Sequence, residues 1–457
     1  MRHVLWRVVF ALVSGMISSS HRPRGLAAKL PILTLMFSLI SSGSRAAIPS
    51  YDFTEATRLM DSNLMHYGAA GVLAIVEQQG RVILRYSNSE GSPLIRVRED
   101  SAIAVASCSK WFSGAIVLAL VERGFFGLDD SIARYLPVFD DPIKREITIR
   151  QCFAMTSGLS LRDPDYELDR SLTLAQSVDL IASNTPIVFP PGTMLDYEGD
   201  AMQVVGRIAE VTTGRDWRDL AREFLFQPLG MSSAAYDVFG LNPAIAGGAR
   251  CSAQDYLKFL RMILHNGVAA DGRIVLSSRT VQTFFTNQTA GLPERFSPWP
   301  ESPYNPYGAR GDYGMGSWIM AVNPDSGTVE EVASPGAFGS FPWVDRRRGL
   351  CGVFFTLTLS QLNDTNPTHL QVLAGIRREI DRVGLPTTTP QSDPDFVRSP
   401  DGFTLRWGGN GTLEESVDLV NWSPIPWATS PFTERWQKVS ASDPTRWFRV
   451  GWRSVGP

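Results

Sequence analysis

The chain has few of the side chains on which common catalytic chemistries depend. Beyond residue 46 it contains three histidines, His66, His265 and His369, and no G-x-S-x-G or H-E-x-x-H pattern occurs. C-x-x-C, G-x-G-x-x-G and phosphate-loop patterns are absent as well. A Ser-His-Asp triad, a zinc centre, a dithiol redox site and a nucleotide site are therefore poorly supported. The sequence implies no metal and no organic cofactor.

An excess of charge of one sign is also missing. The 457 residues carry 43 basic and 46 acidic side chains, a net charge of −3, so no nucleic-acid partner is predicted. Beyond the N-terminus, no uninterrupted apolar run is long enough to span a bilayer. With 44% hydrophobic residues, the chain can build two or three ordinary globular domains.

The N-terminal residues 1–46 have the pattern of an export signal. Basic residues precede an apolar stretch, Leu30–Ile40, and Ser44-Arg45-Ala46 supplies small residues for cleavage. We expect cleavage after Ala46 or Ala47 and a periplasmic, outer-surface or extracellular location. A start at Met16 would give a more ordinary signal length, and an uncleaved membrane anchor is the alternative.

Cysteine is scarce. The four cysteines of the expected mature chain are Cys108, Cys152, Cys251 and Cys351. Two disulfides would be permitted in an exported protein, with three possible pairings. Each cysteine lies within an apolar pattern, however, and a chain of this size needs no covalent staple. Free, buried thiols are the favoured prediction.

Hydrophobic periodicity predicts a sheet whose strands come from both ends of one domain. The predicted elements are a helix over Phe53–Tyr67, a hairpin over Val72–Leu84, mostly helical segments from Thr148 to Leu292, a loop over 293–313, strands over Met315–Val322, Phe338–Val344 and Leu350–Leu359, and a closing helix over His369–Val383. This order favours an α/β fold, an αβα sandwich with an antiparallel sheet, with a helical lobe inserted between the strands.

A second, smaller domain is predicted beyond a stiff linker. Residues 385–395 are rich in proline and threonine, and residues 396–457 contain short strand patterns separated by polar turns. This is the pattern of a small all-β module. Its six tryptophans, half of the chain's twelve, favour an aromatic core over a carbohydrate-binding surface, although both interpretations stay open.

The most informative residues are Ser107 and Lys110. Apolar spacing predicts a buried helix that begins near Ala106, so these two side chains share one face of its first turn. Desolvation and the positive end of a helix both favour a neutral amine, which can take a proton from a serine hydroxyl. Lysine is rare here, with five among 43 basic residues. A serine N-cap beside a snorkelling lysine is the structural alternative.

Further motifs strengthen the catalytic interpretation. Ser107-Cys108-Ser109-Lys110, an apolar helix and Gly127-Leu128-Asp129-Asp130 together resemble the serine β-lactamase and penicillin-binding superfamily. The branch most resembled holds class C β-lactamases, related esterases and D-amino-acid peptidases. The resemblance covers residues 50–384. The other matching blocks are Ile147-Thr148-Ile149-Arg150, Thr156-Ser157-Gly158-Leu159, Pro191-Gly192-Thr193, Tyr197, Pro228-Leu229-Gly230-Met231, Gly247-Gly248 and Tyr313-Gly314-Met315-Gly316.

The resemblance implies a site at the junction of the sandwich and the helical lobe. It assigns Ser107 as the acylated nucleophile and Lys110 as the general base. Tyr197 takes the position of a tyrosine that passes a proton to the leaving group. A turn tyrosine that packs on a helix is the structural alternative for Tyr197.

The resemblance also assigns a strand motif, Ser334-Pro335-Gly336-Ala337. Ser334 and Gly336 are expected to contact the substrate, with Gly336 allowing it to lie against the strand. The backbone N–H groups of Ala337 and Ser107 would form the oxyanion hole.

Two departures from the family pattern affect the expected substrate. The tyrosine motif usually reads Y-x-N but is Tyr197-Glu198-Gly199 here, and the strand motif begins with Ser334 where a lysine or histidine is usual. Both changes weaken the case for a β-lactamase or carboxypeptidase, whose substrates carry a carboxylate. Arg310 could supply a compensating charge. Glu198 is expected to be a surface carboxylate rather than an acid catalyst.

The favoured function is that of an exported serine hydrolase which cleaves a small-molecule ester, amide or peptide through an acyl-enzyme on Ser107. A D-amino-acid peptidase or β-lactamase is one alternative. Another is a catalytically weak cell-envelope binding protein that works through residues 395–457. That segment resembles a short β-sandwich repeat of exported bacterial proteins, through Leu413–Trp422 and Phe448-Arg449-Val450. Its expected role is attachment, sorting or glycan contact.

Overall fold

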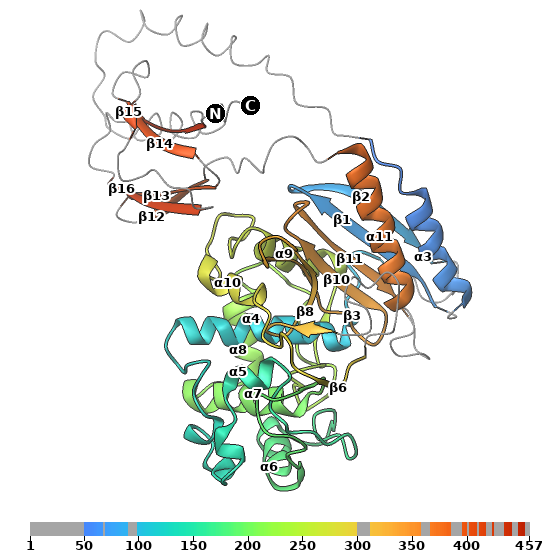
Figure 1. Cartoon of the computed structure of the whole chain (residues 1–457), viewed down its shortest axis with the longest axis vertical. Helices are drawn as coiled ribbons and strands as arrows, with labels where there is room; N and C mark the ends of the chain where they lie inside the picture. Colours follow the sequence, from blue (N-terminus) through green and yellow to red (C-terminus); the bar gives the residue numbers. More distant parts are fainter. Residues whose placement is uncertain are drawn as a thin grey trace, which may run out of the picture. The chain divides into compact units, whose positions relative to one another are not determined.

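The computed structural model describes residues 50–66, 69–89, 98–298, 311–357 and 366–384, together with six strands beyond residue 394. The chain divides into two compact units, one of residues 51–383 and one of residues 1–50 with 384–457 (Figure 1). The expected signal segment, Arg310 and the linker up to residue 394 lie outside the described residues.

A seven-stranded antiparallel sheet organises the 51–383 unit. Its order is β2-β1-β11-β10-β9-β8-β7. The strands are β1 (Val72–Gln78), β2 (Arg81–Asn88), β7 (Asp312–Tyr313), β8 (Trp318–Val322), β9 (Val329–Ala333), β10 (Ser340–Asp345) and β11 (Leu350–Thr356). The β1–β2 hairpin turns at Gln79 and Gly80, whose φ angles of 49° and 76° match the twist of the strands. The strands from both ends of the unit meet where β1 pairs with β11.

Helices cover both faces of this sheet. Figure 1 shows α3 (Thr54–His66) and α11 (Asn366–Val383) side by side on one face, with α9 (Ala253–Leu264) on the other. The apolar stripe of α9 buries Tyr256, Phe259 and Leu260. The predicted αβα sandwich with an antiparallel sheet is confirmed.

Two details of the strand prediction were wrong. β9 was missed because Glu330 and Glu331 interrupt its apolar pattern, although the buried Glu331 carboxylate pairs with Arg377 of α11. The predicted 293–313 loop contains β6 (Glu294–Phe296) and β7 at its ends. β6 pairs in parallel with β4 (Leu195–Asp196). Such short strands depend on tertiary pairing and leave no periodic signal in the sequence.

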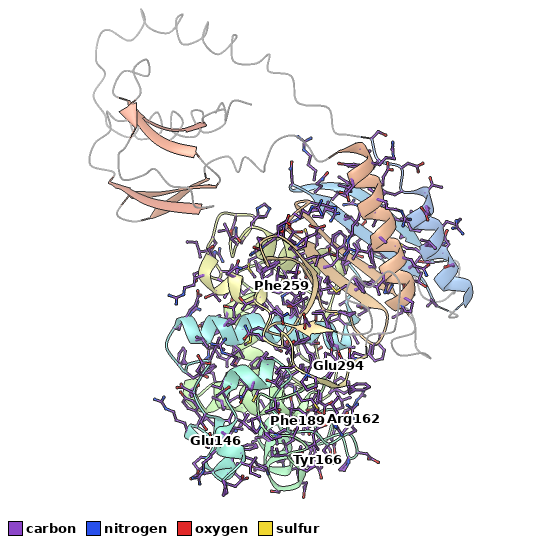
Figure 2. The ribbon with its side chains drawn as sticks, in the orientation of Figure 1. Glu146, Arg162, Tyr166, Phe189, Phe259 and Glu294 are labelled. Atoms are coloured by element: carbon purple, nitrogen blue, oxygen red, sulfur yellow. The ribbon has the colours of Figure 1, made fainter. Side chains whose placement is uncertain are left out.

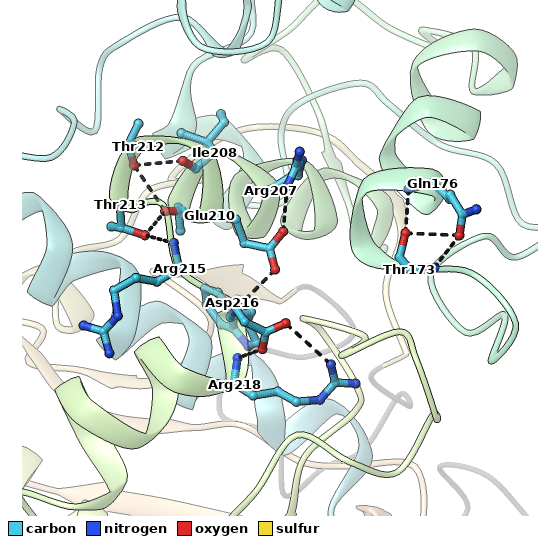
Figure 3. Close-up of polar contacts among 12 residues, drawn as sticks. Thr173, Gln176, Arg207, Ile208, Glu210, Thr212, Thr213, Arg215, Asp216 and Arg218 are labelled. Carbon is cyan, nitrogen blue, oxygen red and sulfur yellow. Dashed lines mark hydrogen bonds and ion pairs between the residues drawn. The ribbon is translucent and has the colours of Figure 1, made fainter.

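The inserted segment forms the predicted helical lobe. Its helices are α5 (Ile149–Phe153), α6 (Leu174–Asn184), α7 (Asp200–Thr213), α8 (Trp217–Ala221), the π-helical turn η6 (Arg222–Phe226) and α10 (Ser278–Phe284), with 3₁₀ turns η3 (Ile132–Arg134), η4 (Pro137–Phe139) and η5 (Lys144–Glu146). Figure 3 shows polar side chains at the N-termini of two of these helices: Thr173 and Gln176 form a reciprocal capping box at the start of α6, and Asp216 is the N-cap of α8.

The other unit contains two three-stranded antiparallel sheets, β12-β13-β16 and β15-β14-β17. Their strands are β12 (Asp395–Ser399), β13 (Gly402–Gly408), β14 (Gly411–Ser416), β15 (Ser423–Pro424), β16 (Glu434–Ser440) and β17 (Trp447–Trp452). The resemblance of this segment to a β-sandwich repeat stays a prediction.

All four cysteines are buried and unpaired, as predicted. Within the described part of the chain, no helix has both the length and the apolar character needed to cross a membrane.

His369 of α11 is a structural histidine. It is completely buried between Phe341 and Phe354, and its Nε2 lies 2.9 Å from the hydroxyl of Thr356. Burial lowers the pKa of His369 to about 3, because a charged imidazole would lose its hydration. The imidazole is therefore neutral in the folded protein at neutral pH.

Protonation of His369 should make the protein acid-sensitive. Between pH 6.5 and about 3, the unfolded chain binds a proton that the folded chain excludes, so the free energy of unfolding falls as pH falls. We expect His369→Gln to reduce this slope by about 1.4 kcal/mol per pH unit. Urea unfolding at several pH values, followed by hydrogen exchange in β11 and α11, measures the slope. His265→Gln, at an exposed position, is the control, and an equal slope in His369→Gln and wild type would contradict the prediction.

Candidate active site

Ser107 lies on a sharp strand-to-helix turn. β3 (Ile103–Ala104) pairs with β5 (Arg250–Cys251), and the 3₁₀ turn η2 (Ala106–Cys108) follows at once. Ala106 has a φ of 47°, a left-handed conformation that is strained for a residue with a β-carbon. The turn leaves Ser107 half-buried and accessible, whereas its neighbours Ala106 and Cys108 are buried.

The helix that follows holds this turn in place. α4 (Ser109–Glu122) is buried from Ser109 to Leu120. Trp111 and Phe112 pack edge-on against Phe259 of α9, at ring-centroid distances of 5.5 and 5.0 Å. These contacts join the turn that carries Ser107 to the helix that covers the sheet; Figure 2 labels Phe259.

Lys110 reaches Ser107 within hydrogen-bond distance. Its Nζ lies 3.1 Å from Ser107 Oγ and donates to the carbonyl oxygen of Ala246, also at 3.1 Å. The side chain is 5% exposed. The structure therefore brings the predicted nucleophile and base together, with the amine largely removed from water.

Tyr197 completes the predicted group of three. It follows β4, and its N–H donates to the carbonyl of Phe296 at 3.0 Å. The ring stacks on Trp318 at 5.0 Å, and its face lies 4.7 Å from Lys110 Nζ. Lys110 thus faces the π-system of Tyr197 in a cation–π geometry. Proton transfer by the phenol stays a prediction.

The strand motif lies in the turn between β9 and β10. The buried Ser334 hydroxyl lies 3.3 Å from the carbonyl oxygen of Ser107 and 3.1 Å from that of Gly316. In this structure Ser334 therefore ties its turn to the backbone next to the nucleophile. Ala337, the last residue of the motif, is half-buried. Substrate contacts by Ser334 and the oxyanion role of Ala337 stay predictions.

Gly336 is required by close packing. A β-carbon built on it would lie 2.1 Å from the carbonyl oxygen of Val105 and 2.9 Å from Cys108 Sγ. Gly336 thus packs against residues 105–108, the turn that carries the predicted nucleophile Ser107 (below, the nucleophile turn). Space for this turn is the structural reason for a glycine here, and the expected substrate contact stays untested.

Three carboxylates near the site were missed or misjudged. Glu198, expected on the surface, is only partly exposed, and burial together with Asp200 and Glu167 raises its pKa well above its usual range. Burial raises the pKa of Glu167 to about 7, and burial and Glu167 raise that of Asp200 to about 7. No motif marks Glu167 in the sequence. Among the described residues, no group of acidic, cysteine or histidine side chains could hold a metal ion.

The 51–383 unit is similar to known proteins. A family model described as Beta-lactamase matches residues 56–374. Penicillin-binding protein 4 from Amycolatopsis lactamdurans is 28% identical over 306 residues, which cover 56% of this chain and 78% of that protein. Esterase EstB from Burkholderia gladioli is 28% identical over 200 residues, 39% of this chain and 50% of that one. A D-aminopeptidase from Cereibacter sphaeroides is 30% identical over 197 residues, 40% and 36% of the two chains.

Solved structures show the same fold. A Bacteroides dorei protein described as a candidate beta-lactamase superposes with a TM-score of 0.64 at 28% identity, over 72% of this chain and 99% of that one. EstCE1, a hydrolase with promiscuous acyltransferase activity, gives a TM-score of 0.58 at 18% identity, over 71% and 98% of the two chains.

Gly336→Ala should loosen the nucleophile turn. The added methyl group would overlap the Val105 carbonyl, so we expect the 51–383 unit to lose about 1–3 kcal/mol of unfolding free energy. Hydrogen exchange in peptides covering residues 105–110 should also become faster. Urea unfolding and exchange mass spectrometry measure both effects. Gly375→Ala is the control, because its nearest neighbour is the flexible end of Arg378 at 3.8 Å; equal behaviour of the two variants would contradict the packing argument.

Proposed function

The chain belongs to the beta-lactamase family, and from this premise we propose that it hydrolyses a carboxylic ester or amide through an acyl-enzyme on Ser107. Members of this family are serine hydrolases, with esterases and peptidases among the relatives of this chain. The observation that carries the proposal is the 3.1 Å contact between the Nζ of the buried Lys110 and the Oγ of the accessible Ser107.

The proposed reaction begins with a proton transfer from Ser107 Oγ to Lys110 Nζ. As the proton leaves, Oγ forms a bond to the acyl carbon, and the negative charge on the former carbonyl oxygen is held by the N–H groups of Ser107 and Ala337. The bond to the leaving group then breaks, and the leaving group takes a proton from Lys110, directly or through Tyr197. Water releases the acid by the reverse sequence.

An uncharged acyl substrate fits the site better than a carboxylate-bearing lactam. The strand motif offers the hydroxyl of Ser334 instead of a cation, and that hydroxyl lies against two backbone carbonyls. Substrates that carry a carboxylate gain most from a nearby positive charge. This favours the esterase interpretation over the peptidase and β-lactamase alternatives, although relatives with each kind of name exist.

Covalent labelling tests the proposal. We expect a fluorophosphonate probe to add one mass increment to the wild-type protein and none to Ser107→Ala, while a penicillin leaves both unmodified. Intact-mass spectrometry of the folded proteins measures the adducts. Ser62→Ala, an exposed serine on α3, is the control and should label like the wild type.

The other outcomes discriminate between the alternatives. Adducts from both probes would move the substrate class to lactams and D-peptides. Labelling by neither probe on folded protein would overturn the proposed activity and favour the binding-protein alternative, in which the 395–457 segment carries the function.

We also propose that the enzyme is exported. The support is the signal pattern within residues 1–46: basic residues, then an apolar stretch, then small residues at the cleavage position. Expression of the full chain in a bacterial host should give a secreted or periplasmic protein that begins at Ala47 or Ile48. N-terminal sequencing of that fraction measures the cleavage point, and retention of the whole chain in the cytoplasm would contradict the proposal.

A further inference from the structure

Glu167 is held beside the catalytic lysine by a well-anchored segment of the helical lobe. The carbonyl oxygen of the preceding residue, Tyr166, accepts hydrogen bonds from Ser177 Oγ at 2.9 Å and from Asn242 Nδ2 at 3.2 Å (Figure 2 labels Tyr166). Both donors are buried. The path of the chain therefore places the Glu167 side chain, which is 8% exposed, in a defined position.

The Glu167 carboxylate and Lys110 bind the same residue. Oε1 of Glu167 accepts a hydrogen bond from the N–H of Ala246 at 3.1 Å, and the carbonyl oxygen of Ala246 accepts one from Lys110 Nζ at 3.1 Å. Ala246 thus connects a buried carboxylate to the buried amine. A carboxylate in this position attracts positive charge on Lys110.

The carboxylate occupies the space of a missing side chain. A β-carbon built on Gly199 would lie 1.5 Å from Glu167 Oε2. Gly199 is the position at which the tyrosine motif departs from its usual asparagine. A side chain at residue 199 would therefore require the Glu167 carboxylate to leave its present position.

Several charged groups face Glu167. Lys110 of α4 favours its ionised form, whereas Asp165 of its own segment, together with Glu198 and Asp200 on either side of Gly199, opposes it. Burial raises the pKa of Glu167 to about 7; Lys110 opposes this rise and Asp165 adds to it. At and above neutral pH a large share of Glu167 therefore carries a negative charge.

We infer that Glu167 is a positioning residue for Lys110: its carboxylate stabilises the ammonium that forms when Lys110 accepts the proton of Ser107. Ser107, Lys110 and Glu167 then act as nucleophile, base and supporting carboxylate, the three roles of a catalytic triad. Ser107 loses the proton, Lys110 gains it, and Glu167 stays ionised throughout. The inference rests on the proposed nucleophile and base.

The charge of Glu167 has a definite effect on the pH profile. The Glu167 carboxylate loses its negative charge as pH falls through about 7, so the stabilisation it gives to the forming ammonium is lost over the same range. The wild-type rate should therefore fall in a step near pH 7, and a variant with an uncharged residue at position 167 should lack that step. A purely structural role for Glu167 would lower the rate and leave the step in place.

Glu167→Gln is the variant that separates these roles, because it keeps the shape and the oxygen that accepts from Ala246. We measure the rate of fluorophosphonate labelling of Ser107 from pH 5 to 10 by intact mass, on full-length protein whose fold is checked by thermal unfolding. We expect the maximal rate to fall about tenfold and the step near pH 7 to disappear. Glu210→Gln is the matched control: Glu210 is a partly buried carboxylate of α7 that accepts from Arg207 (Figure 3).

A second variant pair tests the shared space. Gly199→Asn alone should displace the Glu167 carboxylate and slow labelling, whereas in a Glu167→Ala background Gly199→Asn should slow labelling no further. A step near pH 7 that persists in Glu167→Gln, with Ser107 still labelled in the wild type, would overturn the inference alone. Absence of labelling in the wild type would instead overturn the proposed activity on which it rests.

Discussion

The burial of α4 is the constraint on which the rest of the 51–383 unit depends. The helix carries the nucleophile turn at its start, and its hydroxyl groups bind segments that are far away in the chain. Ser113 Oγ donates to the carbonyl of Ile245 at 2.6 Å, and Ser109 Oγ accepts from the N–H of Ala249 at 2.9 Å. These bonds fix the 245–249 segment, and with it the Ala246 carbonyl that holds Lys110. One buried helix therefore aligns Ser107, Lys110 and the carbonyl group that binds Lys110.

The surroundings of Lys110 combine opposite influences on its charge. Removal from water disfavours an ammonium, whereas the Tyr197 ring face, the Ala246 carbonyl and the buried carboxylate of Glu167 all favour one. The general-base role proposed for Lys110 needs both influences, because such a base is neutral before the reaction and charged during it. Two turns pack against each other at Ser107. The turn with the left-handed residue Ala106 carries Ser107, and the strand motif lies close to it because Gly336 has no side chain.

Sequence patterns predicted those helices and strands whose stabilising interactions are local or repetitive. The β1–β2 hairpin, the amphipathic α11 and the strands β10 and β11 are evident from hydrophobic periodicity, because each buries one face or a continuous apolar run. β9 and β6 are not, because β9 contains two glutamates and β6 three residues. Burial of Glu331 is possible only because Arg377 of α11 pairs with it, and such a partner cannot be inferred from a strand pattern.

The same distinction applies to the site. The Ser107–Lys110 pair could be predicted from the sequence alone, because a spacing of three residues on a helix places both side chains on one face. Resemblance added Tyr197 and the strand motif, but not their contacts. Long-range packing was needed to show that Glu198 is partly buried, that Ser334 bonds to backbone carbonyls, and that Glu167 fills the space beside Gly199. Glu167 and Gly199 are joined by no helical or strand periodicity, so their contact depends on the path of the whole lobe between them.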